Sequence, residues 1–520
     1  MPHTNVCTEI QKLGVIPAKR QHRSRPFGYI SCRLSYFDRM SQRIFFTTLL
    51  WLVIVNLLIK AIFIFGIDLQ VQHQVGQSAY GLYFTLLNLC YIFQIVNEFG
   101  LNLVHNTDTA FHGHVRKAHW HSILRLKLVL SIVYALVVFG VARLLGFTAS
   151  WNILWWLILN NILISWITLL RAGISGMARY KMEAILSVMD KVLMILICGS
   201  MFFLFDVFQI EWFIWAQTIS LVITLLMAVW ISQRVSSGQR QEKGSPDTSV
   251  FFTFKSAVPF SVATLLMFVY TRSDSILIKK LLPEGDHEVG IFAAGFRLLD
   301  AANMIAFLFT PLLIPMYARL QANAKEVKEL MRLAGGMMIC MATCISFAGY
   351  WWARPIMQLC YGQADQQWVM TFSWLILAHI PVGLMYVYGS YLTAVRVLWK
   401  QNILYITSVA LNILLNLYLI PRYGTIGAAF TAFVTQSLTT IGLILLVQRQ
   451  LELAPNFSWL LKALLFVLFL FAGGWLLVSM PIHWMLGIGL FLSVGVGVAF
   501  LLRILDWEKM VGLIRKAEEV

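Results

Sequence analysis

The chain has 520 residues, of which 59% are hydrophobic and 12% are charged, and its formal net charge is +16. A soluble domain carries about 25% charged residues, and a soluble fold of this size could not bury so much apolar surface. The composition therefore excludes an ordinary soluble protein and predicts an all-α integral membrane protein.

Apolar segments of bilayer length follow one another along the chain, and a spanning helix needs ~20 mostly apolar residues. The basic, polar residues 1–43 come first, lack the apolar core of a cleaved signal peptide, and are predicted to form a cytoplasmic tail. We predict about fourteen spans, at residues 44–66, 79–101, 122–145, 151–175, 182–204, 209–232, 251–281, 289–317, 333–353, 368–394, 399–420, 424–448, 458–480 and 484–504.

The spans divide into two groups of six and a terminal pair. Residues 44–232 would form an N-terminal lobe and residues 251–448 a C-terminal lobe, joined by a Gly/Ser-rich, charged linker at 233–250. Residues 449–520 would add two spans and a cytoplasmic tail. Most of the 40 Lys and Arg residues fall on one side of this arrangement, so the positive-inside rule predicts that both termini are cytoplasmic.

A weak internal repeat supports two lobes in the same orientation. AYGLYFTLLN, residues 79–88, opens the second span, and EVGIFAAGFR, residues 288–297, opens the eighth. Gly81 and Gly290 would then be equivalent positions. Several secondary transporters are built from such parallel repeats, with the binding site at their interface.

Ionisable residues inside the predicted spans mark the candidate site, because a charge in the bilayer costs roughly 2.5–3.5 kcal/mol on insertion scales and is usually functional. They are Lys60, Glu98, Asp190, Lys191, Arg272, Asp274, Arg297 and Asp300. Such side chains face a partner or a hydrated cavity, and two lobes packed face to face could bring them around one cavity.

Spacing separates the possibilities. Arg297 and Asp300 are three residues apart, share a helix face and could neutralise each other. Arg272 and Asp274 diverge by about 200° on a regular helix, so at least one must face another helix or the substrate. Arginine suits phosphate because its planar fork donates paired hydrogen bonds, so a cavity with Arg272, Arg297 and Lys60 would suit a diphosphate.

Structural alternatives remain for several of these residues. Lys60 could reach the outer membrane interface with its long side chain. Asp190 and Lys191 could form a structural ion pair, and Glu98 could be solvated near the cytoplasmic end of its span.

Other sites are not expected. The chain has no Walker A motif, no HExxH motif and no nucleophile–base arrangement, which favours a transporter over an enzyme. The basic residues form no domain with interleaved aromatics, so no nucleic-acid partner is expected, and we predict no metal and no cofactor. We interpret the His-rich segment as a solvated loop; its histidines are His105, His112, His114, His119 and His121.

Several motifs in order resemble the Wzx-type oligosaccharide flippases, polysaccharide transporters of the multidrug/oligosaccharidyl-lipid/polysaccharide (MOP) exporter superfamily. They are YGLYFTLLN followed by NEFGLNLVHN, then DSILIKKLLPEGDHEVGIFAAGFRLLD, TPLLIPMYARL and LNILLNLYLIPRYGTIGAAFTAFVTQ. The last is the most specific, with Asn412, Asn416, Pro421 and the Gly427-Ala428-Ala429 run. Taken in this order, the motifs are distributed over nearly the whole chain.

The resemblance implies two V-shaped helical lobes around a cationic cavity, onto which Arg272, Arg297 and Lys60 map. It implies transfer of undecaprenyl-diphosphate-linked oligosaccharide from the inner to the outer leaflet of the bacterial cytoplasmic membrane, for lipopolysaccharide or exopolysaccharide biosynthesis. Polysaccharide polymerase, glycosyltransferases and membrane lipids would be its partners. Coupling to H⁺ or Na⁺ would use an embedded acid, and the candidates are Asp274, Asp300, Glu98 and Asp190.

Three alternatives stay open at this point. A drug/cation antiporter of the same superfamily would use the acids directly and keep the arginines as structural residues. A lipid II flippase would share the fourteen spans and the lobes, although its N-terminal signature of a Gly-rich turn with Asp-Ala and Pro-Asn is absent here. A membrane scaffold for polysaccharide enzymes would transport nothing.

Overall fold

The computed structural model describes residues 55–112, 117–147, 150–177, 179–205, 207–236, 250–321, 323–362, 364–452 and 457–505. Within these ranges the chain is helical and contains no strand. The predicted tail at 1–43, most of the predicted linker and the segment 506–520 lie outside the described residues.

The N-half, defined as the described residues up to 236, begins with a helix over Val55–Val75. This helix contains a π-helical segment, η1 (Phe63–Asp68), and continues as α4 (Leu69–Val75). The remaining helices of the N-half are α5 (Gln77–Glu98), α6 (Leu101–His112), α7 (Lys117–Leu144), α8 (Trp151–Gly176), α9 (Tyr180–Leu204) and α10 (Ile210–Ser236).

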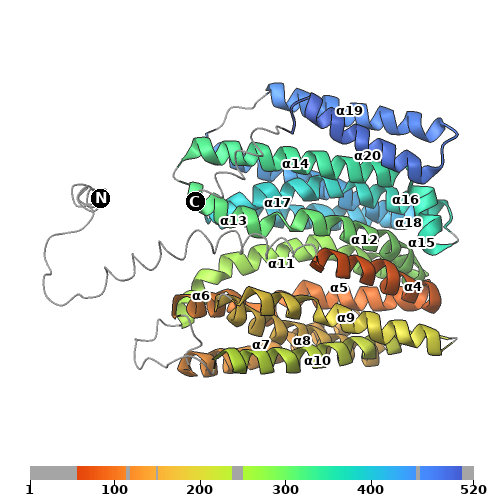
Figure 1. Ribbon diagram of the computed structural model, residues 1–520. Coiled ribbons are helices and arrows are strands. Elements are labelled where there is room, and N and C mark those ends of the chain that lie inside the picture. Colours follow the sequence, from red (N-terminus) through yellow and green to blue (C-terminus); the bar gives the residue numbers. More distant parts are fainter. Residues whose placement is uncertain are drawn as a thin grey trace, which may run out of the picture.

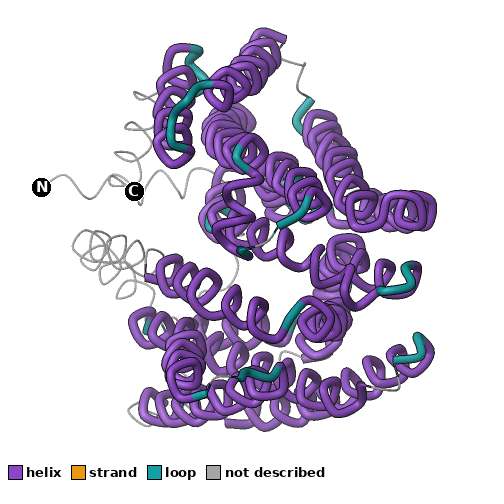
Figure 2. The backbone as a smooth tube through the Cα atoms, turned by 90° about the vertical axis from the view of Figure 1, so that its right-hand side faces the viewer, coloured by secondary structure: helices purple, strands orange, loops and turns teal. Residues whose placement is uncertain are grey.

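The C-half, from residue 250 onward, packs beside the N-half, as the green and blue helices beside the orange and yellow ones in Figure 1 show. Its helices are α11 (Val250–Leu281), α12 (Gly285–Phe307), α13 (Thr310–Leu320), α14 (Ala324–Trp351), α15 (Ala353–Tyr361), α16 (Gln366–Leu377), α17 (His379–Ala394), α18 (Leu398–Gln450), α19 (Phe457–Ser479) and α20 (Trp484–Leu501). The view along the bundle in Figure 2 shows the helices clustered side by side with short loops at their ends.

The described residues contain 13 helices that are long and apolar enough to cross a membrane. One of them, α18, has 53 residues and would extend for about 80 Å if straight, more than twice a bilayer core of ~30 Å. It is a hairpin: the backbone leaves helical geometry at Gly424 (φ 59°), and Ser408 Oγ lies 2.7 Å from Thr439 Oγ1 across the bend. Its two arms correspond to the predicted spans 399–420 and 424–448.

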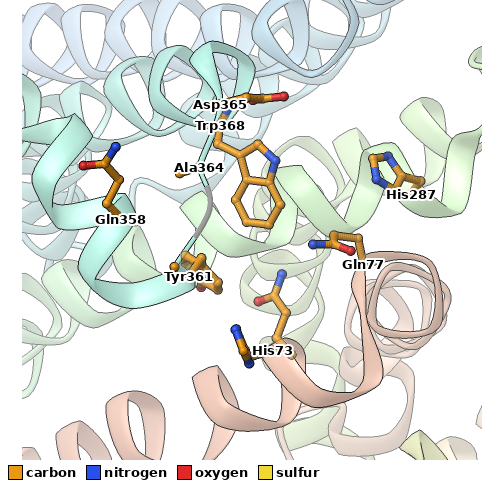
Figure 3. Close-up of a pocket in the computed structure, with 10 residues that line it drawn as sticks. His73, Gln77, His287, Gln358, Tyr361, Ala364, Asp365 and Trp368 are labelled. Carbon is orange, nitrogen blue, oxygen red and sulfur yellow. The ribbon is translucent and has the colours of Figure 1, made fainter.

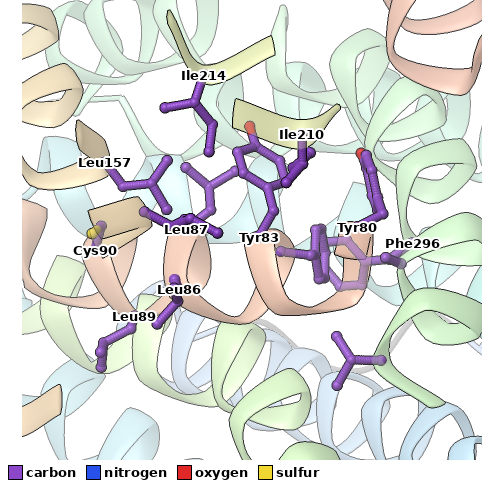
Figure 4. Packing of buried hydrophobic residues seen from close by; sticks show 14 of the residues in the cluster. Tyr80, Tyr83, Leu86, Leu87, Leu89, Cys90, Leu157, Ile210, Ile214 and Phe296 are labelled. Carbon is purple, nitrogen blue, oxygen red and sulfur yellow. The ribbon is translucent and has the colours of Figure 1, made fainter. Parts of the chain in front are cut away.

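Helix α5 forms the contact between the halves, because it packs against α7 and α8 on one side and against α11 and α12 on the other. Figure 4 shows its buried side chains: Tyr83 and Leu87 point toward Leu157 of α8 and Ile210 and Ile214 of α10, and Leu86 and Leu89 point to the opposite side. Leu157 of α8 and Phe296 of α12 belong to the same hydrophobic cluster. The face of α5 that the N-half buries is thus continuous with the face that meets the C-half.

The two glycines of the predicted repeat meet across this contact. A Cβ on Gly81 of α5 would lie 2.7 Å from the backbone nitrogen of Gly290 and closer still to the carbonyl oxygen of Asp286. A Cβ on Gly290 would in turn collide with the carbonyl group of Gln77. Because Gln77 precedes Gly81 by the same four residues by which Asp286 precedes Gly290, the crossing is symmetric. Only glycine allows the two backbones to approach this closely.

Three expectations about element boundaries were wrong. The first span was predicted to end at residue 66, whereas the helix continues to Val75. The predicted His-rich loop contains α6, and His105 is buried against the ring of Trp120. The segment between the predicted spans 333–353 and 368–394 contains α15. Amphipathic segments with polar residues on one face account for these errors, since mean hydropathy does not separate them from loops. The predicted spans 289–317 and 368–394 lie within the candidate spans Gly285–Leu320 and Gln366–Ala394, each built from two consecutive helices.

Candidate functional site

Arg272 of α11 lies where α5, α11 and α12 converge between the halves. Its guanidinium donates to both carboxylate oxygens of Asp300, at 3.3 and 3.4 Å, and to Asn88 Oδ1 at 3.5 Å. The rings of Phe296 and Tyr91 flank it, with centroids 4.8 and 5.7 Å from Cζ. The Arg272 side chain keeps 18% of its surface exposed, so this cation is paired but remains accessible.

Arg297 of α12 is held differently. Its Nε donates a hydrogen bond at 2.9 Å to the hydroxyl of Tyr80 and forms an ion pair at 2.9 Å with Oδ2 of Asp68, a residue of η1 that is 3% exposed. Tyr80 also donates to the same Asp68 oxygen at 2.9 Å. These three residues, which we call the distal lock, join η1 and α5 of the N-half to α12 of the C-half.

The sequence left open whether Arg297 and Asp300 neutralise each other, and in the structure each has a different ion-pair partner. Asp300 pairs with Arg272 on α11, and Arg297 pairs with Asp68 on η1. Residues three apart on one helix share a face, but each side chain here extends to a different neighbouring helix. The pairs are set by which helices α12 touches and not by the spacing within α12.

Asp274 faces away from Arg272, as the 200° divergence predicted. It is 1% exposed, and its Oδ1 accepts hydrogen bonds from Asn416 at 2.7 Å and Asn412 at 3.2 Å, both on the first arm of α18. Its other oxygen, Oδ2, has no hydrogen-bond partner. Asp274 thus belongs to the contact between α11 and α18, within the C-half.

A ladder of polar residues lines the α18 hairpin next to Asp274. Ser408 faces Thr439, and steps of four residues along both arms place Asn412 opposite Thr435 and Asn416 opposite Thr431. Buried oxygens without a hydrogen-bond partner gather here: Asp274 Oδ2, Asn416 Oδ1, Thr431 Oγ1 and Thr435 Oγ1. Buried polar atoms without a partner are costly, and the two threonine hydroxyls among them can donate as well as accept a hydrogen bond.

Lys60 and Asp190 lie in the N-half. The Lys191 ammonium is 3.1 Å from Asp190 Oδ2 and 4.7 Å from the ring centroid of Phe63, so Asp190 and Lys191 do form an ion pair. Lys60 is half-buried and interacts electrostatically with the charged groups of Lys191, Arg171 and Asp190. The structure therefore groups Lys60 with the N-half cations and not with Arg272 or Arg297.

Glu98 ends α5 and lies in a polar cluster inside the N-half. It accepts a hydrogen bond from Gln94 at 3.4 Å and interacts electrostatically with the Lys127 ammonium on α7. Lys127 is fully buried and donates to the carbonyl oxygen of Asn97 at 2.9 Å and to the hydroxyl of Ser165. The positive charge that interacts with Glu98 is thus the ammonium group of Lys127, a side chain of the protein itself.

Two charges of the interior were not expected from the sequence. Asp68 was placed in a loop, and Lys127 was counted among the cytoplasmic ends of helices. The signal for Asp68 was its spacing of four from Gln72, which puts both side chains on one helix face, and both are buried. Lys127 carried no such signal, because a lysine one turn inside a helix end is ordinarily solvated. Among the described residues, no cluster of three or more His, Cys, Asp or Glu side chains could hold a metal ion.

The fold is shared with known membrane transporters. The structure is similar to that of the lipid II flippase MurJ in an inward closed conformation, with a TM-score of 0.61 and 11% identity over 88% of this chain and 98% of that one. It is also similar to the MATE transporter VcmN of Vibrio cholerae, with a TM-score of 0.55 and 16% identity over 80% and 98% of the two chains. An inward-facing multidrug resistance MATE transporter of the MOP superfamily gives 0.56 and 12% over 77% and 98%. At these identities the likeness shows the fold alone.

Sequence comparison identifies the family. No curated protein sequence matches the chain. The family model described as polysaccharide biosynthesis protein matches residues 45–321, more than half of the 520 residues. The match and the transporter fold agree with a multi-pass membrane protein. The chain belongs to the polysaccharide biosynthesis protein family, as its Wzx-like motifs predicted, and its fold is similar to that of solved flippase and MATE transporter structures.

Proposed function

We propose that the protein is a flippase that moves undecaprenyl-diphosphate-linked oligosaccharide from the inner to the outer leaflet of the bacterial cytoplasmic membrane. The family and the transporter fold support this proposal. A charged, hydroxyl-rich headgroup cannot cross ~30 Å of hydrocarbon unaided, whereas its lipid tail can stay in the bilayer. Rocking of one half against the other would carry the headgroup between the leaflets. Both termini are cytoplasmic in this proposal.

The main support for the proposal is that Arg272 is weakly hydrogen-bonded and partly exposed between the halves. Its bonds to Asp300 and Asn88 measure 3.3–3.5 Å, whereas a strong charge-assisted bond measures about 2.7–2.9 Å. Its guanidinium is therefore loosely held, partly exposed and situated between the halves. A diphosphate can replace Asp300 and offer the paired oxygens that a guanidinium binds best. Arg272 is the proposed phosphate ligand.

Arg297 takes a different role in this scheme. Its Nε is already within 2.9 Å of Asp68 and of Tyr80, so it acts as a lock between the halves and not as the first phosphate ligand. Lys60 and Lys191 lie in the N-half and add positive charge on the path that a diphosphate would follow from the cytoplasm. Asp300 is the counter-ion of Arg272, and Asp190 is the counter-ion of Lys191.

Asp274 is the proposed ion-coupling residue. It supplies a single negative charge, and the hydroxyl and amide oxygens around it are neutral, so the cluster suits one proton or one monovalent cation. Moving one charge through 100 mV supplies about 2.3 kcal/mol, enough to bias a conformational equilibrium about fiftyfold. Glu98 is less suitable for this role because Lys127 already supplies the cation beside it.

The test is complementation of a strain that lacks the gene. Wild type, Arg272→Ala and Arg272→Lys are compared at matched membrane levels, with Arg422→Ala as the control, because Arg422 is an exposed arginine at the Gly424 bend. We expect Arg272→Ala to lose surface polymer and to accumulate lipid-linked oligosaccharide in the inner leaflet. We expect Arg272→Lys to retain partial function, since the charge stays and the fork is lost.

Two outcomes would contradict the proposal. Normal polymer in the deletion strain, with no second transporter present, would exclude flipping as the function. A deletion strain with normal polymer but new sensitivity to cationic drugs would favour a drug/cation antiporter. Replacing external Na⁺ by K⁺, and collapsing the pH gradient in a separate arm, would identify the coupling ion, and Asp274→Asn should abolish either dependence.

A further inference from the structure

A pocket of about 970 Å³ opens at the end of the molecule that carries the α4–α5, α11–α12 and α15–α16 turns, which we call the distal end. One wall comes from the N-half and includes His73 of α4 and Gln77 of α5. The other wall comes from the C-half and includes His287 of α12 and Trp368 of α16. Figure 3 shows these side chains approaching one another from opposite ribbons, with the Trp368 ring directed toward Gln77 and His73. The pocket therefore spans the boundary that has to open during alternating access.

The chemistry of the walls is polar and almost uncharged. Among the described residues, the lining contains no Lys and no Arg, and its one carboxylate there, Asp365, caps α16 by accepting a hydrogen bond from Trp368 N at 3.1 Å. The other large side chains that line the pocket are three glutamines, two histidines, a tyrosine and a tryptophan. A diphosphate would find no cation here. Side-chain amides both donate and accept, as sugar hydroxyls do, and aromatic rings present an apolar face to the C–H groups of a sugar ring.

The pocket also holds an unsatisfied buried group. Gln72 is 2% exposed, and its Nε2 donates to the carbonyl oxygen of Gly290 at 2.8 Å. Gln72 is a lining residue of the same pocket, and its Oε1 is buried and has no hydrogen-bond partner. A buried acceptor without a donor costs about 1–3 kcal/mol, which a ligand hydroxyl would recover only if the amide turned toward the pocket. Beside it, the rings of Tyr361 and Trp368 form an aromatic corner with centroids 5.3 Å apart.

The distal lock separates this pocket from Arg272. Asp68 lies one helical turn before Gln72, and Arg297 lies seven residues, about 10 Å, beyond Gly290 along α12. The lock and the Gly81–Gly290 crossing thus lie between the proposed phosphate ligand and the pocket. A headgroup whose diphosphate is held at Arg272 would reach the pocket only after the halves part at the distal end.

We propose that the distal pocket is a carbohydrate subsite that receives the uncharged sugars of the headgroup on the outer side. This inference rests on the proposed flippase function and adds to it a separate site for the sugars. The diphosphate and the sugars would then be recognised by different chemistry at different depths. The volume lies at the upper end of the range for small-molecule sites, ~300–1,000 Å³, and suits more than one sugar ring.

The test measures occupancy of the pocket in cells. A His287→Cys variant is labelled from outside with a membrane-impermeant maleimide in a strain that makes the complete lipid-linked oligosaccharide and in a strain blocked before the first sugar is added. The control is Tyr423→Cys, an exposed position at the Gly424 bend. Cys360, which adjoins the lining residue Tyr361 in sequence, should contribute little background, because burial raises its pKa to about 11 and the thiolate is the reactive form.

We expect labelling of the His287→Cys variant to slow at least threefold when the oligosaccharide is made, with no change at the control position. We also expect Trp368→Ala to lower polymer output several-fold, Trp368→Phe to restore most of it, and Trp155→Ala, an exposed tryptophan on α8, to have no effect. Equal labelling in the two strains, with flipping still dependent on Arg272, would overturn the subsite and leave the flippase proposal intact. Normal polymer in the deletion strain would overturn both.

Discussion

The crossing of α5 and α12 predicts a large effect from the addition of one methyl group. In Gly81→Ala the new Cβ would lie 2.7 Å from Gly290 N and closer still to the carbonyl oxygen of Asp286, whereas Cβ atoms in real structures keep at least 3.0 Å from such neighbours. The helices must therefore separate by more than the few tenths of an ångström that the contact with Gly290 alone would require. Overpacking of this kind costs about 1–3 kcal/mol. The cost applies only while the distal end is closed, so the ratio of closed to open molecules should fall about 5- to 150-fold.

Spin labels at Ser78→Cys and His287→Cys, near the distal ends of α5 and α12, would measure the change as a distance distribution. We expect Gly81→Ala to move the population toward longer distances, and Gly290→Ala to do the same because the crossing is symmetric. Gly140→Ala is the matched control, since a Cβ at this glycine of α7 meets nothing within 4 Å. An unchanged distribution in folded Gly81→Ala protein would refute the view that this crossing holds the distal end closed.

Three further outcomes follow from particular contacts. Asp68→Asn leaves Arg297 without its carboxylate, and breaking a buried ion pair costs about 3–5 kcal/mol. The melting temperature in detergent should therefore fall. In an Arg297→Met background, Asp68→Asn should cause little further fall in melting temperature. Gly424→Ala forces a side chain into φ 59°, ψ −139° and should destabilise the α18 hairpin by about 1–3 kcal/mol in the same assay, whereas Gly473→Ala, which meets no neighbour, should not. The Cys360 thiol should react with maleimide about tenfold faster for each pH unit up to about 11, because its thiolate fraction rises below that pKa; a pH-independent rate would contradict the burial argument.

The sequence was sufficient for what depends on composition and on the spacing within one helix. Hydropathy located the long helices, and the 200° angle between Arg272 and Asp274 correctly separated their environments. The repeat also had physical content, because Gly81 and Gly290 proved to be the two halves of one crossing. Each of these conclusions requires only the geometry of a single helix or a comparison of two segments.

The partners of the charges depend on how helices are rotated against one another, and one sequence does not give that rotation. Arg297 is the cation nearest to Asp300 in sequence, yet Asp300 bonds to Arg272. The glycine crossing with α5 fixes the rotation of α12, and this rotation decides which face of α12 meets α11. Asp68 was missed because its helix continues into α4, whose sequence LQVQHQV mixes polar and apolar residues and is buried on one face at Val71 and Gln72. Helix ends and rotations are tertiary properties.

The arrangement of the acids suggests how substrate binding could open the distal end. If a diphosphate displaces Asp300 from Arg272, the freed carboxylate lies three residues from Arg297 on the same helix and can compete with Asp68 for it. Transfer of Arg297 from Asp68 to Asp300 would break the only ion pair of the distal lock and leave the glycine crossing as the remaining barrier. We therefore expect Asp300→Asn to retain binding of the lipid-linked diphosphate at Arg272 but to keep the distal end closed, so that added substrate no longer lengthens the distance between labels at Ser78→Cys and His287→Cys. In wild type the same addition should lengthen it. Opening that is equally responsive in Asp300→Asn would show that the carboxylate does not connect the two arginines.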